Sequence, residues 1–169
     1  NWTIGVNGIP TGWVVQNVET GFTIKALDNN FTFQNNKAVT YSTDNGATWT
    51  SLAANTSSPQ FASGTTIMVN GNTFDYVGTI SSVGRFKAYG NPKSLRYGSS
   101  WSGHTPLVGE NQYPSLFSGA TGLTDAAGLL LTATTVSNYG YMDMFYDCTS
   151  LTATPSLPAT TVGIDGYRG

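Results

Sequence analysis

The chain has 169 residues, of which only 9% are charged, and its formal net charge is -2. An ordinary soluble domain is about 25% charged, so Thr, Ser, Asn and Gly replace charged side chains here, which indicates a hydroxyl-rich, all-β protein. This net charge gives no electrostatic footprint for a nucleic acid, and the longest apolar run is far too short to span a bilayer. We therefore expect no nucleic-acid partner and no membrane insertion.

Residues 1–90 contain short segments rich in β-branched and aromatic residues, separated by Asn, Gly, Asp and Ser turns. Strands of this number and length predict an N-terminal β-sandwich of immunoglobulin-like size, without the cysteine pair of true immunoglobulin domains. The expected strands are Trp2–Val6, Trp13–Asn17, Phe22–Ala26, Phe31–Gln34, Ala38–Ser42, Thr48–Leu52, Thr65–Val69 and Gly84–Tyr89.

Within this first domain, residues 42–49 read Ser-Thr-Asp-Asn-Gly-Ala-Thr-Trp, which resembles the Asp-box of sialidases and other β-rich proteins. The pattern predicts a hairpin in which Asp44 caps turn amides, Gly46 takes a positive φ and Trp49 packs beneath the turn. In families that carry the box it lies away from the catalytic centre. A sialidase would also need several boxes, an arginine cluster and a longer chain.

Residues 91–169 contain an internal repeat. Residues 116–124 match residues 144–152 at an offset of 28, and residues 131–136 match residues 157–162 at an offset of 26. Repeats of this period stack on one another to bury their apolar faces, so we expect a short leucine-rich-repeat-like solenoid. Leu123 and Leu151 are the expected inward rungs, and residues 113–119 and 138–146 form its helical or turn side. Residues 163–169 begin another turn, so we expect a truncated piece of a longer protein.

Catalytic and metal-binding residues are sparse. His104 is the only histidine and Cys148 the only cysteine, so we expect no metal site, no cofactor and no Ser-His-Asp triad. Cys148 occupies the repeat position of Ala120, which indicates a small buried residue rather than a nucleophile. The acidic pair Asp143 and Asp147 has no counterpart in the preceding repeat and is better explained as solvated surface than as a glycosidase pair. We expect no enzyme activity.

Aromatic side chains beside hydroxyl-rich segments are the candidate ligand-binding residues. Sugar-binding surfaces favour flat aromatic rings flanked by Asn, Ser and Thr, although core packing competes for the same residues. The candidates are Trp101, Tyr97, Tyr113, Tyr139 and Tyr141. A second feature, the group of basic residues Arg85, Lys87, Lys93 and Arg96, is better explained as a solvated strand and turn than as an anion site.

Several blocks together resemble the BspA-like leucine-rich-repeat surface proteins of anaerobic gut and oral bacteria, and similar modules occur in virion proteins of phages that infect such hosts. The blocks are residues 41–50, 86–91, 116–124, 144–153 and 157–161. The first repeat departs from the family pattern, with Ala120 where the family tends to have Cys and Thr132 where it tends to have Pro. The resemblance implies an extracellular adhesive or host-interaction module without catalysis, and it transfers no binding residues.

Two hypotheses follow. The first is a non-catalytic adhesion or host-interaction module, extracellular on a bacterial cell surface or a virion, that binds a surface glycan or a protein. The alternative is a structural component of a phage virion or surface assembly, such as a fibre or decoration protein, that forms a homo-oligomer through the open edge of the solenoid. The low charge predicts that binding depends weakly on salt.

Overall fold

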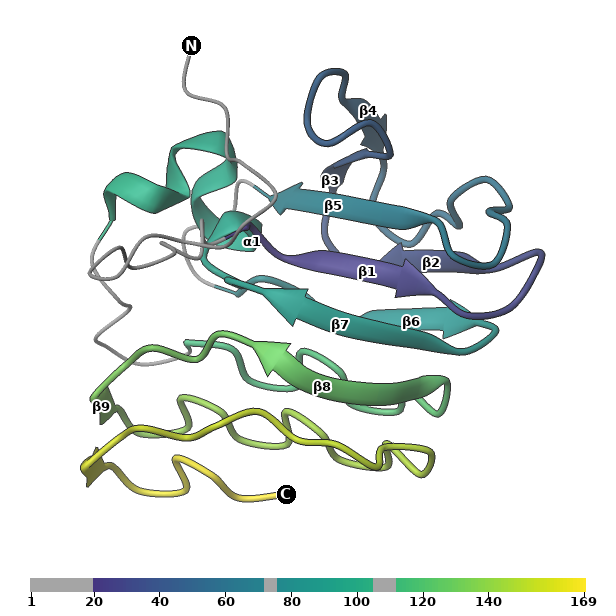
Figure 1. Cartoon of the computed structure of the whole chain (residues 1–169). Coiled ribbons are helices and arrows are strands. Elements are labelled where there is room, and N and C mark those ends of the chain that lie inside the picture. Colours follow the sequence, from purple (N-terminus) through teal and green to yellow (C-terminus); the bar gives the residue numbers. More distant parts are fainter. Residues whose placement is uncertain (1–19, 72–75, 105–111) are drawn as a thin grey trace, which may run out of the picture.

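The computed structural model describes residues 20–71, 76–104 and 112–169, and the chain in these ranges is mostly β-structure in open sheets, as the composition predicted (Figure 1). The strands are β1 (Thr23–Ala26), β2 (Thr32–Asn35), β3 (Val39–Ser42), β4 (Thr50–Leu52), β5 (Thr66–Gly71), β6 (Ile80–Val83), β7 (Phe86–Gly90), β8 (Leu123–Leu129), β9 (Thr135–Val136) and β10 (Thr161–Val162). A one-turn helix, α1 (Ser94–Tyr97), continues into a 3-10 helix, η1 (Gly98–Gly103).

Six strands form one sheet in the order β4-β3-β5-β1-β7-β8. The pairs from β4 to β7 are antiparallel, whereas β8 joins β7 in parallel. Strands β2 and β6 form a separate antiparallel pair that packs on the sheet, because the ring of Phe33 on β2 lies 6.0 Å from that of Tyr41 on β3. The immunoglobulin-like form of this arrangement stays a prediction.

Six of the predicted strands are confirmed as β1, β2, β3, β4, β5 and β7, with ends shifted by one or two residues. Buried and exposed side chains alternate along these strands. On β7, for example, the side chains of Phe86 and Ala88 are buried while Lys87 between them is exposed. Strand β6 was not predicted, since its sequence Ile-Ser-Ser-Val has little apolar character. The expected strands Trp2–Val6 and Trp13–Asn17 lie outside the described residues.

The repeated segments stack on one another through backbone hydrogen bonds. On one side, the amides of Tyr113 and Phe117 donate to the carbonyls of Gly140 and Met144, at 2.7 and 2.9 Å. The next layer follows the same rule, with residues 139, 141 and 143 donating to residues 164, 166 and 168. On the other side, β9 pairs in parallel with β10. The turns therefore follow one another at 25 to 28 residues, close to the sequence period. Their assignment as leucine-rich repeats stays a prediction.

One residue, Phe117, connects the stacked turns to the sheet. Its side chain is fully buried, and its ring centroid lies 6.0 Å from Phe22, 6.4 Å from Phe86 and 5.6 Å from Phe145. The backbone also joins here, because the amide of Ile80 on β6 donates to the carbonyl of Leu116. Buried residues from both halves of the sequence thus belong to one cluster. The predicted domain boundary at residue 90 stays a prediction.

Helix α1 lies against the end of β5 because Gly71 has no side chain. A Cβ atom on Gly71 would overlap the backbone carbonyl of Leu95. Gly98, with a φ of +56°, then turns the chain from α1 into η1, and its Cβ position would lie 3.2 Å from the carbonyl oxygen of Gly71. These two glycines hold the start of η1 beside the sheet.

We predict that Gly71→Ala lowers the free energy of unfolding by about 1 to 3 kcal/mol, because the new methyl group must displace backbone atoms. Gly103→Ala is the matched control, since nothing lies within 4 Å of its Cβ position, and it should change stability by less than about 0.5 kcal/mol. Urea unfolding measures both. Equal stability of the two variants would contradict the close approach of α1 to β5.

Candidate functional site

A cleft of about 500 Å³ lies on the outer face of the sheet where β4, β3 and β5 end beside η1. Val39 and Tyr41 on β3 face the core, so Thr40 between them points to the opposite face. One wall of the cleft is formed by strand residues and the other by the start of η1. The lining residues used below are Thr40, Trp49, Ser51, Asn70, Gly98 and Ser99.

Three of the lining side chains form a polar row across adjacent strands. Thr40 pairs with Ser51 on β4 and with Asn70 on β5, which places the three side chains next to one another on one face. Asn70 is only 8% exposed. Within the described residues, none of these three side chains makes a hydrogen bond. The Asn70 amide, which still reaches solvent, and the two hydroxyls are therefore available to a ligand.

The indole of Trp49 stands at the edge of the row, and the Asp-box hairpin holds it there. Asp44 Oδ1 accepts from the Thr48 amide at 2.9 Å and from the Ser42 hydroxyl at 2.7 Å. Gly46 has a φ of +84°, and its carbonyl accepts from Trp49 Nε1 at 3.0 Å. The predicted hairpin geometry is confirmed.

Hydrogen bonds to Asp44 stabilise its charged form. The hydroxyl and the amide of Thr48 are the main donors, and the hydroxyl of Ser42 adds a third; together they lower the pKa of the Asp44 carboxyl to about 2. The carboxylate is therefore ionised at neutral pH, in the turn that ends at Trp49.

The five aromatic residues proposed from the sequence do not form one platform. Tyr113 and Tyr141 are both 4% exposed, and their rings stack in the core with centroids 5.9 Å apart. Burial raises the pKa of both hydroxyls. These two residues are rungs of the repeat, which removes them from the ligand-binding surface that the sequence suggested.

The other three candidates lie nearer the surface but apart from the cleft lining. Tyr97 and Trp101 are half-buried at α1 and η1, where the Tyr97 ring stacks on His104 with centroids 3.8 Å apart. His104 is exposed, as expected of a turn residue. Tyr139 is 42% exposed on a turn of the repeat. Tyr139 lies on the repeat, whereas Tyr97 and Trp101 lie at α1 and η1, so the three side chains come from different parts of the fold.

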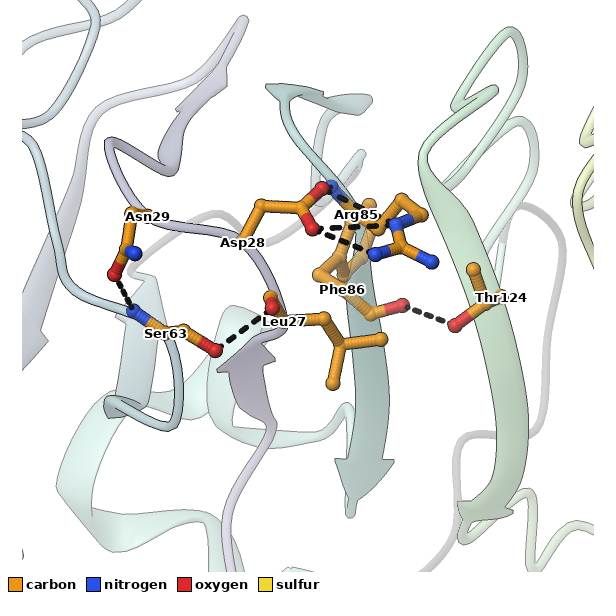
Figure 2. A network of polar contacts seen from close by, with 7 residues as sticks. All are labelled: Leu27, Asp28, Asn29, Ser63, Arg85, Phe86 and Thr124. Carbon is orange, nitrogen blue, oxygen red and sulfur yellow. Dashed lines mark hydrogen bonds and ion pairs between the residues drawn. The ribbon is translucent and has the colours of Figure 1, made fainter.

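Two of the clustered basic residues are exposed and neutralised, as expected of a solvated strand. Arg85 forms an ion pair with Asp28 at 2.8 Å (Figure 2), and Lys87 forms one with Asp125 at 2.9 Å. Lys93 differs from the prediction, because it is 7% exposed; its ammonium donates to the carbonyl of His104 at 2.6 Å and lies 5.5 Å from the Trp101 ring centroid. Its aliphatic stem packs inside the fold while the charge reaches a carbonyl and an aromatic face.

Cys148 is a half-buried repeat residue whose thiol donates to the carbonyl of Phe117 at 3.1 Å. Burial raises its pKa to about 11, so the thiol is protonated at neutral pH. Asp143 and Asp147 both have left-handed backbone angles and occupy turns. The described part of the chain contains no cluster of three or more His, Cys, Asp or Glu arranged for a metal, and none of its helices is long and apolar enough to cross a bilayer.

No protein-family model, curated protein or solved structure matches this chain. The resemblance to BspA-like proteins therefore stays a prediction. Any assignment of function rests on the geometry of the cleft.

Thr40, Ser51 and Asn70 were not among the binding residues predicted from the sequence. The alternation Val-Thr-Tyr-Ser around Thr40 was visible and indicates an outward-facing hydroxyl. The pairing of β3 with β5 brings Asn70 beside Thr40, although the two are 30 residues apart in the sequence. No local turn signal predicts this pairing.

We predict that Asp44→Asn destabilises the protein at neutral pH and that this difference from the wild type disappears in acid. The folded pKa of Asp44 lies below its unfolded value, so its stabilising effect is present above about pH 4 and is lost as pH falls toward 2. Urea unfolding at pH 7, 4 and 2.5 measures the difference. Comparing variant with wild type removes the contributions of Asp28 and Asp125, whose pKa values are also lowered.

Asp147→Asn, in another exposed turn, controls for the loss of one negative charge. A difference between Asp44→Asn and the wild type that stays constant from pH 7 to 2.5 would show that the Asp44 carboxylate does not stabilise the hairpin.

Proposed function

We propose that this chain is a non-catalytic binding module that holds a surface glycan in the cleft beside Trp49. The observation that carries the proposal is the side chain of Asn70, a residue that is 8% exposed, lines the cleft and has no side-chain hydrogen-bond partner among the described residues. Solvent still reaches this amide in the cleft, so a ligand hydroxyl can replace water on it.

The neighbouring groups suit the same ligand. A sugar ring presents hydroxyls at its edge and C–H groups on its face, and the row of Ser51, Thr40 and Asn70 lies beside the indole of Trp49. A glycosidase needs two carboxyl groups about 5 to 10 Å apart. None of the described lining residues is Asp or Glu, which supports binding without hydrolysis.

The wider proposal is an extracellular adhesion or host-interaction module on a bacterial surface or virion, with an immunoglobulin-like sandwich followed by a leucine-rich-repeat-like solenoid. Two packed β-layers and turns stacked at 25 to 28 residues support these fold assignments. The low charge and the resemblance of the repeats to BspA-like proteins support the location.

Two buried asparagines provide a matched test. Asn70→Ala removes an unpaired amide, so it should leave stability unchanged or raised and weaken glycan binding at least about tenfold. Asn35→Ala removes an amide that donates to the carbonyl of Val77 and accepts from the Lys37 amide. That variant should lose about 1 to 3 kcal/mol of stability and keep its affinity when folded.

A glycan array identifies the ligand, and isothermal titration calorimetry with urea unfolding compares the variants. Full affinity of Asn70→Ala, or the absence of any glycan ligand, would overturn the proposed function.

A structural role in a virion or surface assembly is the second candidate, and the exposure of the last repeat favours it. Leu157 and Val162 are 51% and 46% exposed, whereas Leu131 and Val136, at the same positions one repeat earlier, are 3% and 1% exposed. Burial of this edge against another subunit would explain the contrast. Light scattering across a wide concentration range tests it: a defined oligomer that Val162→Asp dissociates supports assembly, and a monomer throughout contradicts it.

A further inference from the structure

We infer that the cleft selects an uncharged saccharide and discriminates against sugars that carry a carboxylate or a sulfate. This inference rests on the proposed function and concerns the chemical class of its ligand. It follows from the side chains that line the cleft and from where the nearby charges are placed.

The polar groups offered to a ligand are all neutral. Among the described lining residues none is charged, and the available groups are the Ser51 and Thr40 hydroxyls and the Asn70 amide. An amide has both a donor and an acceptor, so it can bind two neighbouring sugar hydroxyls at once. Recognition of a carboxylate or sulfate normally uses Arg or Lys, because a desolvated anion without a cationic partner is strongly disfavoured.

Two basic residues near the lining in sequence, Lys37 and Lys93, make their contacts elsewhere. Lys37 precedes Ala38 at the cleft, but its ammonium lies 5.7 Å from the centroid of the Tyr76 ring. Lys93, which precedes α1, donates to the carbonyl of His104. Neither contact places a cation on the row of hydroxyls.

A negative charge lies in the hairpin that holds Trp49. The Asp44 carboxylate accepts from both the amide and the hydroxyl of Thr48, the residue before Trp49. Asp44 is exposed and lies outside the cleft lining, so it repels an anion only weakly, and salt screens the effect. The neutral lining and the Asp44 carboxylate both disfavour an anionic ligand. Because a neutral ligand forms no ion pair, its binding should be nearly independent of salt.

The test compares lactose and other neutral oligosaccharides with the same sugars carrying sialic acid, glucuronic acid or sulfate, by calorimetry at 50 and 500 mM NaCl. We expect the wild-type protein to bind a neutral member at least about tenfold more tightly than its acidic derivative, with little change between the two salt concentrations. Ser51→Lys should reduce this preference and make binding of the acidic sugar salt-dependent. Ser150→Lys, which adds the same charge at an exposed position outside the cleft lining, should change neither property.

An acidic sugar that binds the wild type equally well or better, and that loses affinity in Asn70→Ala, would overturn this inference and leave the proposed function standing. If neither neutral nor acidic sugars bind, or if Asn70→Ala binds them normally, the proposed function fails and the inference fails with it.

Discussion

The packing of Phe117 between the sheet and the repeats is the interaction on which the architecture depends. Its ring contacts Phe22 and Phe86 of the sheet on one side and Phe145 of the next turn on the other. Strand β8 can then continue the sheet in parallel with β7, and each later turn repeats the register of the one before. The sheet thus covers the first apolar layer of the stack, which an isolated repeat cannot bury alone. At the other end of the sheet, β3, β4 and β5 are left to form the cleft.

Two buried asparagines differ in their hydrogen bonding: the amide of Asn35 bonds to the backbone, whereas the amide of Asn70 has no partner among the described residues. Asn35 has both ends of its amide satisfied by backbone groups, which fixes the chain after β2. Asn70 is nearly as buried, yet its amide lines an open cleft without a partner among the described residues. Polar side chains that are left without a hydrogen-bond partner in this way are expected at sites where a protein binds a ligand. Gly71 and Gly98 complete the cleft by letting η1 approach without side chains that would fill it.

Local patterns in the sequence predicted the elements whose causes are local. The pattern of residues 42–49 predicted a turn that depends on Asp44 and Gly46, and the repeat offset predicted that the repeated segments stack on one another. Tyr113 and Tyr141 were predicted to lie on a binding surface, because an aromatic side chain in the sequence is equally compatible with a sugar-binding surface and with the hydrophobic core. Only the register of the stacked turns directs their rings inward. The cleft depends on the pairing of β3 with β5 and on the packing of α1 against β5. Both are contacts between residues far apart in the sequence, so local sequence patterns do not predict them.

The measurement that tests the central claim most directly is a ¹⁵N NMR titration that follows the side-chain amides of Asn70 and Asn35 and the indole of Trp49 as a neutral oligosaccharide is added. The account predicts saturable shifts of Asn70 and Trp49 with one shared dissociation constant, while Asn35 stays unchanged. Shifts confined to Tyr139 and the last repeat, with Asn70 and Trp49 unmoved, would contradict it and place binding on the stacked turns.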